Sequence, residues 1–145
     1  MEETDFKIGI AFSGGGYRAA LFSLGVLSYL NNVLVRNKTL LLRVIALSTV
    51  SGGTITGSKY AVGIKNNESF EDIYKDLYSF MNKVNLIEAG LDKLNSEVNW
   101  GDRRIRSLIN AFSDVYDEIL FKKIKFGILL SKTNPIHLKH ISFNA

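Results

Sequence analysis

Two stretches decide the fold: Lys7-Ile8-Gly9-Ile10-Ala11-Phe12-Ser13-Gly14-Gly15-Gly16-Tyr17-Arg18 and Val44-Ile45-Ala46-Leu47-Ser48-Thr49-Val50-Ser51-Gly52-Gly53. Each is an apolar, strand-like run that ends in glycines and leads into a helix-like segment. Glycines at such turns let the backbone bend sharply and expose its N–H groups. Strands that alternate with helices in this way predict a parallel or mixed sheet in a three-layer α/β domain.

Hydrophobic periodicity places the remaining elements. The expected strands are 6–12, 40–50 and the start of another at 141–145. The expected helices are 18–35, 53–64, 69–84 with Ser69 as N-cap, and 102–119. The helix at 18–35 is apolar almost all round, which predicts a central position against the sheet. Residues 85–101 are expected to be rich in loops, and 124–130 fit either a helix or a strand.

Composition limits the class of protein. A chain of 145 residues fits one domain, and the absence of cysteine excludes disulfides and thiolate metal sites. The N-terminus is acidic and lacks the basic start and apolar run of a secretion signal, so a reducing, cytoplasmic location is expected. The most apolar stretch, 19–35, is interrupted by polar residues and is too short to span a membrane.

Charge is distributed unevenly along the chain. Residues 1–102 carry ten Lys/Arg and eleven Asp/Glu, whereas residues 103–145 carry eight and three. The basic second half is compatible with peripheral contact to an anionic membrane surface or a phospholipid headgroup, and equally with a solvated charged face. Nucleic acid is not expected as a partner, because no recognised binding motif accompanies the charge.

The two glycine clusters could together support acyl transfer. Gly14, Gly15 and Gly16 have no side chains to obstruct their N–H groups, and they precede a helix whose N-terminal dipole favours negative charge. Such donors would stabilise an oxyanion. Ser51 stands at a strand-to-helix turn, where its hydroxyl would project from the C-terminal edge of the sheet as a nucleophile.

These motifs resemble the patatin-like phospholipase family, in which a Gly-Gly-Gly-x-Arg loop forms the oxyanion hole and a Gly-x-Ser-x-Gly turn carries the nucleophile. The resemblance covers residues 6–61. It implies a three-layer α/β/α sandwich and a lipid acyl hydrolase acting on phospholipid or glycolipid esters, without metal or organic cofactor. It assigns Ser51 the nucleophile role, Gly14 to Gly16 the oxyanion hole, and Arg18 and Gly53 supporting roles.

The sequence departs from the family pattern at two points. Thr49 stands where the family has its first glycine, and a β-branched residue is bulky at a tight crossing of strand and helix, so a shifted turn is one expectation. The family's base is an aspartate in a later Asp-Gly-Gly or Asp-Gly-Ala segment, and the chain contains no Asp-Gly dipeptide. We therefore expect residues 1–145 to be the N-terminal part of the domain, inactive alone, with a second chain or further sequence completing it.

Other interpretations remain open at this level. The chain could be a catalytically dead binding or scaffold remnant, or an α/β-hydrolase esterase that uses His137 or His140 as base. The two histidines could also suggest a metal pair, but no carboxylates cluster around them. Gly14-x-Gly16-x-x-Ala19 matches a loose dinucleotide fingerprint without the acidic residue that should follow. Ser51 could simply cap a helix, and Arg18 could form a surface ion pair.

Overall fold

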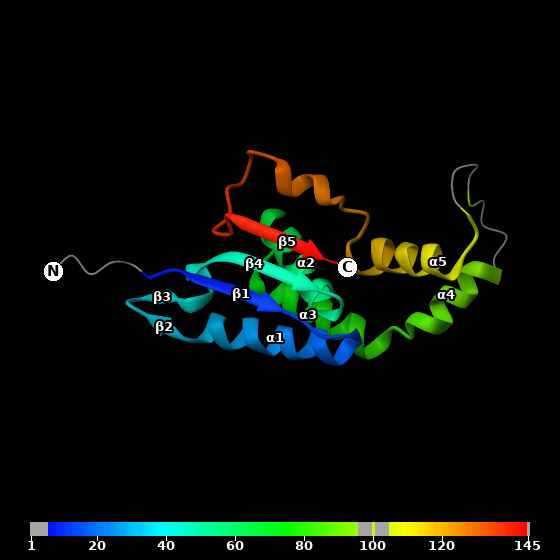
Figure 1. Ribbon diagram of the computed structural model, residues 1–145, viewed down its shortest axis with the longest axis horizontal. Coiled ribbons are helices and arrows are strands. Elements are labelled where there is room, and N and C mark those ends of the chain that lie inside the picture. Colours follow the sequence, from blue (N-terminus) through cyan, green and yellow to red (C-terminus); the bar gives the residue numbers. More distant parts are fainter. Residues whose placement is uncertain (1–5, 96–99, 101–104, 145) are drawn as a thin grey trace.

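The computed structural model describes residues 6–95, 100 and 105–144. Three strands, β1 (Ile8–Phe12), β4 (Val44–Val50) and β5 (His140–Asn144), form a parallel sheet in the order β1-β4-β5 (Figure 1). The apolar runs at 6–12 and 40–50 and the short run at 141–145 therefore contain strands, as expected. All three strands point the same way, so their carboxyl ends lie along one edge of the sheet.

Five α-helices and several short elements connect and cover the strands. The helices are α1 (Gly16–Asn32), α2 (Gly52–Lys65), α3 (Phe70–Lys83), α4 (Leu86–Asn95) and α5 (Leu108–Val115). The short elements are the hairpin β2 (Leu34–Val35) and β3 (Lys38–Thr39), the 3₁₀ turns η1 (Leu40–Arg43) and η3 (Phe126–Leu130), and the π-helical turn η2 (Tyr116–Leu120). No described helix is long and apolar enough to cross a bilayer.

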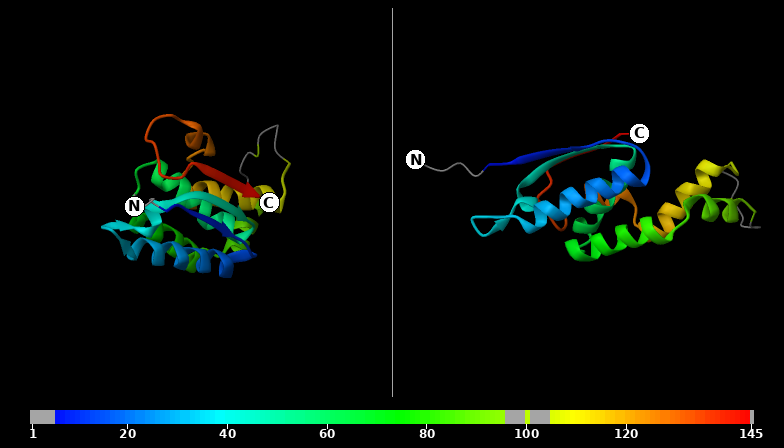
Figure 2. Two further views of the ribbon diagram at one scale, coloured as in Figure 1. Left: turned by 60° about the vertical axis from the view of Figure 1, so that its left-hand side comes forward. Right: turned by 90° about the horizontal axis from the view of Figure 1, so that it is seen from below.

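The helices pack on one face of the sheet and leave the other face open (Figure 2). The small residues Gly9, Ala11, Ser48 and Ser142 are exposed on the open face. Parallel sheets in α/β proteins are normally covered on both faces. The α/β class with a parallel sheet is confirmed, and the described residues supply the sheet and one helical layer of the sandwich.

The central helix is α2 rather than α1, which corrects the expectation for 18–35. Nearly every residue of α2 is buried, because it lies between the sheet, α1, α3 and η3. In α1, by contrast, Phe22 is 74% exposed and Tyr29 is 65% exposed. A helix that is apolar all round in sequence need not be buried all round, since the neighbours that cover it come from distant parts of the chain.

Several boundaries also differ from expectation. Residues 40–43 form η1 instead of the start of a strand, and 33–35 leave the helix for the hairpin. The stretch 85–101, expected to be rich in loops, contains α4. Gly90 lies within this helix. A methyl group at that position would lie 2.5 Å from the Phe112 ring, so the glycine allows α4 to pack closely against α5. The helix expected at 102–119 begins at Leu108 after the N-cap Ser107, and Asp102 lies outside the described residues.

Buried lysines on α2 fasten the segments around it. The Lys59 ammonium pairs with Glu68 at 2.7 Å and Asp76 at 3.0 Å. The Lys65 ammonium donates hydrogen bonds to the backbone carbonyls of Ser131, Thr133 and Asn134, and it thereby holds the segment that leads into β5. Both charges are satisfied in the interior, where an unpaired ammonium would be costly.

Candidate active site

Ser51 occupies a sharp turn between β4 and α2. Its backbone has φ 53° and ψ −127°, a conformation that non-glycine residues rarely adopt. Although Ser51 is the N-cap residue of α2, its side chain makes no capping hydrogen bond. The interpretation of Ser51 as a helix-capping serine is therefore wrong. A strained serine that caps nothing has the geometry of a nucleophile elbow.

The two glycines after Ser51 make this turn sterically possible. A methyl group at Gly52 would collide with the backbone of Gly16, and one at Gly53 would lie 2.7 to 2.8 Å from Phe12. Helix α2 therefore begins in direct contact with both β1 and the glycine loop. Gly53 was expected to support the elbow, and the contact with Phe12 gives the steric reason, since any side chain at position 53 would push α2 away from β1.

Thr49 fits the crossing of strand and helix because Gly57 lies opposite it. Its side chain is buried and faces Gly57 on α2, where an added methyl group would lie 2.5 Å from Thr49 Cγ2. In the family pattern a glycine at position 49 makes room for the helix. In this chain the room comes from Gly57 on the helix, which has no side chain to meet Thr49. With Thr49 in place, Ser51 adopts the strained elbow conformation.

The glycine loop lies directly against the elbow. The backbone N–H of Gly52 donates a 2.8 Å hydrogen bond to the carbonyl of Gly14, which joins the two turns. Gly14 and Gly16 have φ values of 94° and 65°, so both need glycine. Gly15 has an ordinary φ of −102°, and a methyl group on it would lie 3.8 Å from the Ser51 hydroxyl oxygen. The missing side chain at Gly15 keeps the space beside that hydroxyl open.

Helix α1 begins in this loop and directs its amino terminus toward the same region. The first N–H groups of any helix have no partner within the helix, and the helix dipole adds positive potential at that end. This arrangement can bind an anion or a developing oxyanion. Arg18, in the first turn of α1, is exposed and forms no ion pair with the described residues. The ion-pair interpretation of Arg18 therefore has no support.

A largely apolar cleft of about 850 Å³ opens at Ser51. Its walls come from α2, α5, η2, the segment around η3, and the end of β5. Apolar lining residues include Ile55, Ile109, Phe112, Phe121, Phe126 and Phe143. Clefts of this size and character hold drug-sized or lipid-like molecules. Sequence reasoning missed these residues, because nothing in the pattern of 105–130 indicates that this segment folds back toward Ser51.

Hydrogen bonds tie the end of β5 to the elbow. The Asn144 side-chain amide donates to the backbone carbonyl of Thr49 at 3.1 Å, and the Thr54 hydroxyl donates to the Asn144 carbonyl at 3.2 Å. Thr49 Oγ1 is 3.1 Å from Thr54 Oγ1. Asn144 and Thr54 therefore position the turn.

A base for Ser51 is not found in the part of the chain that the structure describes. The Ser51 hydroxyl forms no hydrogen bond there. Asp117 lines the cleft, but its carboxylate pairs with the Lys125 ammonium at 2.7 Å. No group of three or more His, Asp or Glu that could hold a metal ion occurs among the described residues.

The two histidines lie at the other end of the sheet. His140 pairs with Ala46 whereas Asn144 pairs with Val50, so His140 is roughly 13 Å along β5 from the elbow end. His137 Nε2 lies 2.8 Å from the hydroxyl of Tyr60. Tyr60 follows Gly52, the first residue of α2, by roughly 12 Å along the helix axis. Burial lowers the pKa of His137. Neither histidine can act as the base of Ser51 in this arrangement.

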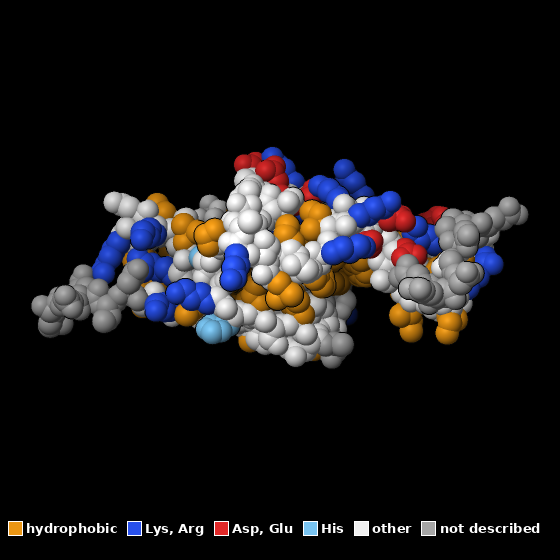
Figure 3. Space-filling view, turned by 90° about the horizontal axis from the view of Figure 1, so that it is seen from above, with side chains coloured by type: hydrophobic (Ala, Val, Ile, Leu, Met, Phe, Trp, Pro, Cys, Tyr) orange, Lys and Arg blue, Asp and Glu red, His pale blue; other side chains and the backbone are white. Residues whose placement is uncertain are grey.

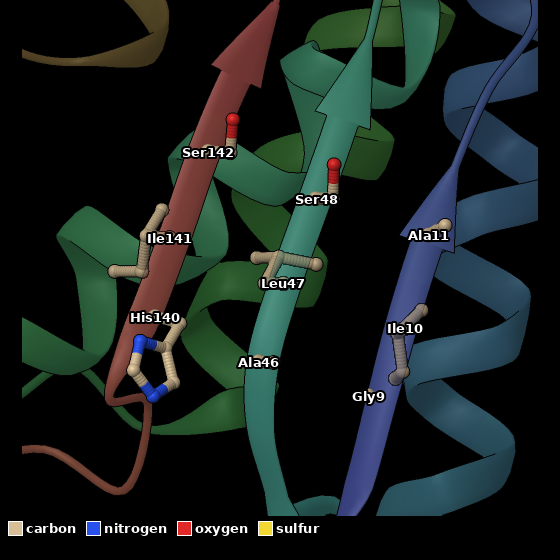
Figure 4. Close-up of a pocket in the computed structure, with 9 residues that line it drawn as sticks. All are labelled: Gly9, Ile10, Ala11, Ala46, Leu47, Ser48, His140, Ile141 and Ser142. Carbon is tan, nitrogen blue, oxygen red and sulfur yellow. The ribbon is translucent and has the colours of Figure 1, made fainter.

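Ser48, the other serine near the elbow motif, belongs to the open face of the sheet. It lines a shallow hollow of about 340 Å³ together with Ser142 and His140. Figure 4 shows Ser48 and Ser142 side by side on neighbouring strands of the sheet. This hollow is separate from the cleft at Ser51, since the two share no lining residue. Ser48 is thus a residue of the sheet surface.

Comparison with known proteins agrees with this geometry. No curated protein and no solved structure matches the chain. The profile of the family described as patatin-like phospholipase matches residues 10–134, which include the glycine loop, the elbow and all five α-helices. Members of this family act on lipid esters. The chain therefore belongs to the patatin-like phospholipase family.

Proposed function

We propose that Ser51 is the nucleophile of a lipid acyl hydrolase. The observation that carries the proposal is the conformation of Ser51, which is strained, caps nothing and faces the open space at Gly15. Backbone strain of roughly 1 to 3 kcal/mol persists only where the surroundings impose it, and it gathers at functional sites. Membership of the patatin-like phospholipase family indicates the class of ester.

The reaction follows from the placement of the hydroxyl. Ser51 Oγ attacks the acyl carbonyl carbon of a lipid ester and forms a tetrahedral oxyanion. The serine proton passes to a base and from there to the departing alcohol oxygen, which leaves an acyl-serine. Water then adds to the acyl-serine, and the fatty acid is released as Ser51 regains its proton. No electron transfer is involved, and no cofactor is proposed.

Gly14, Gly15 and Gly16 supply the oxyanion hole in this proposal. Their N–H groups lie at the amino end of α1, and the hydrogen bond between Gly52 and the Gly14 carbonyl fixes the loop against the elbow. A preorganised donor of this kind is worth roughly 2.7 to 4 kcal/mol in the transition state. Arg18 adds positive charge in the first turn of the same helix.

The apolar cleft would hold the acyl chain. It begins at Ser51 and Gly16 and continues along Ile55, Phe112 and Phe126, so a chain esterified at the site has an apolar path. Burial of each methylene contributes roughly 0.8 kcal/mol, which favours long acyl groups over short ones. The preference for lipid esters would arise from the apolar lining of the cleft.

The aspartate base is proposed to come from outside these 145 residues. The chain contains no Asp-Gly dipeptide, and no described carboxylate contacts Ser51. The open face of the sheet supports the same view, since a parallel sheet of this kind takes helices on both faces. The chain would then be the N-terminal part of a patatin-like domain.

Fluorophosphonate labelling followed by intact-mass measurement tests the proposal. The 145-residue chain alone should give no adduct. A protein that also carries the aspartate-bearing remainder, on the same polypeptide or a second one, should give one. That adduct should disappear in Ser51→Ala and persist in Ser48→Ala, the matched control from the same strand.

Each other result has a definite meaning. An adduct that survives in Ser51→Ala removes Ser51 from the mechanism. An adduct at Ser51 of the isolated chain shows that the base lies within these residues. No adduct in either protein contradicts the hydrolase and favours a catalytically dead remnant.

A further inference from the structure

A second large pocket lies between η3 and the segment that leads into β5, both orange to red in Figure 1. Its volume is about 780 Å³, and Lys65, Lys132 and Lys139 contribute to its wall, so we call it the lysine pocket. It meets the Ser51 cleft at Phe126 and Phe143, which line both. Pockets of this size hold drug-sized molecules. The chemistry proposed at Ser51 assigns no ligand to the lysine pocket.

Much of the wall of the lysine pocket is apolar. Leu130, the last residue of η3, is 88% exposed, the highest value among the large apolar side chains of the described residues. Leu129, Ile136 and Ile141 line the same pocket, and buried Leu138 lies in its wall. A ligand with an alkyl chain would remove this surface from water, which favours its binding.

The charge of this wall is positive throughout. Its lining contains three lysines and no Asp or Glu, and the sequence from 119 to 145 contains five lysines and no acidic residue. Lys132 and Lys139 are exposed and form no ion pair with the described residues. Figure 3 shows Lys and Arg side chains (blue) beside hydrophobic ones (orange) on the face of the molecule that carries η3.

Acidic side chains of the neighbouring elements are engaged elsewhere. Glu68, just after α2, pairs with the Lys59 ammonium at 2.7 Å. Asp76 on α3 pairs with Lys59 at 3.0 Å and with Lys122 at 2.7 Å. Neither carboxylate lines the lysine pocket. The two exposed lysines therefore have their charges available for an anion.

Lys65 adds a buried positive charge behind the loop 131–134. Its side chain is 4% exposed, and its ammonium donates hydrogen bonds to three backbone carbonyls of that loop. The carbonyls satisfy the hydrogen bonds but carry no net negative charge, and no described carboxylate pairs with this ammonium. Buried charges in proteins are normally paired. Lys65 thus fixes the loop that carries Lys132 and leaves a positive potential in the wall.

We propose that the lysine pocket binds the anion of a long-chain fatty acid, with its carboxylate among the lysines and its alkyl chain against Leu130 and Ile136. A small anion such as phosphate would leave the apolar wall unused, and a neutral lipid would leave the lysines without a counter-charge. Binding requires no catalysis. Only its biological sense rests on the proposed function, since hydrolysis of a lipid ester would release such an anion beside the pocket.

Titration with sodium dodecanoate below its micelle concentration tests the proposal on the ¹⁵N-labelled chain. The amide NMR signals of Gly127 and Lys132 report on the lysine pocket, and those of Gly52 and Ser113 report on the Ser51 cleft, so each pocket gives its own dissociation constant. Dodecanoate should shift the Gly127 and Lys132 signals. 1-Dodecanol has the same chain without the charge, and acetate has the carboxylate without the chain. Each should bind the lysine pocket more weakly than dodecanoate by roughly tenfold or more.

Matched substitutions separate the charge from the apolar wall. Lys132→Gln and Lys139→Gln should each weaken dodecanoate binding at the lysine pocket roughly fivefold and leave dodecanol binding unchanged. Leu130→Ser should weaken the binding of both ligands roughly tenfold. Lys38→Gln and Leu34→Ser change exposed residues of the β2–β3 hairpin, outside both pockets, and should have no effect.

Four results would overturn the proposal. They are unshifted Gly127 and Lys132 signals, dodecanol binding as tight as dodecanoate binding, unchanged dodecanoate binding in both lysine variants, and loss of the binding in a protein that also carries the aspartate-bearing remainder. The last result would make that remainder the occupant of the pocket. Ser51→Ala, which should abolish fluorophosphonate labelling, should leave dodecanoate binding at the lysine pocket unchanged. The two proposals therefore fail separately.

Discussion

Replacing Gly57 by alanine tests how α2 crosses the strand that carries the elbow. A methyl group at Gly57 would lie 2.5 Å from Thr49 Cγ2 and 3.5 Å from Leu47 Cδ2. Overpacking of this kind costs roughly 1 to 3 kcal/mol, while alanine in a helix interior gains about 1 kcal/mol over glycine. Gly57→Ala should therefore lower the free energy of unfolding by up to about 2 kcal/mol, because the clash at 2.5 Å outweighs the gain in propensity.

A double-mutant cycle isolates the clash. Thr49→Ser removes Cγ2 but keeps the hydroxyl that lies 3.1 Å from Thr54 Oγ1. In the Thr49→Ser background, Gly57→Ala should be stabilising by up to about 1 kcal/mol, which gives a coupling energy of roughly 1 to 3 kcal/mol. Gly25→Ala, in α1 with no atom within 4 Å of the added methyl group, should be stabilising in either background.

Urea unfolding followed by circular dichroism measures all of these free energies. The reasoning fails if Gly57→Ala stabilises the original chain as much as Gly25→Ala does. It also fails if the effects of Thr49→Ser and Gly57→Ala simply add, since a steric contact between the two positions requires coupling.

The remaining predictions concern the elbow and a buried histidine. Ser51→Gly should raise the free energy of unfolding by about 1 kcal/mol in urea titrations, because glycine relieves the strain at φ 53°. Ser48→Gly, in the regular part of the strand, should lower it, and stabilisation by both variants would count against strain at Ser51. Burial lowers the pKa of His137 below its ordinary value of 6.5, so the unfolded chain binds this proton more readily than the folded chain. The contribution of neutral His137 to the free energy of unfolding should be fully present above pH 6.5 and be lost as the pH falls below that value. His137→Gln should flatten this part of the plot of unfolding free energy against pH. An unchanged slope in that variant would show that another group titrates.

The sequence by itself determined the strands at β1 and β4, the glycine loop and the elbow. These features are local: an apolar run, a set of glycines and a serine at a strand-to-helix turn define each other within about ten residues. The glycine loop and Ser51 meet because parallel strands place their carboxyl ends at one edge of the sheet. That meeting could be predicted before any contact was known.

Contacts between distant segments decided the rest. The close packing of α4 on α5 depends on Gly90 fitting against the Phe112 ring, and no window of sequence around 85–101 contains that contact. Likewise, Thr49 is acceptable at the elbow only because Gly57 lies opposite, on the next helix. Local patterns record propensity and periodicity, whereas steric fit depends on which atoms the fold brings together.

For the candidate site too, part could be predicted from the sequence and part depended on the tertiary structure. The sequence determined that a serine and three glycines would lie at the end of a sheet, because strand direction and turn chemistry are properties of short segments. Only the tertiary structure decided that Ser51 caps nothing, that α5 and η3 wall an apolar cleft beside it, and that the histidines lie at the opposite end. Side-chain burial and the shape of a cleft are sums over residues remote in sequence, and they exist only after the chain has folded.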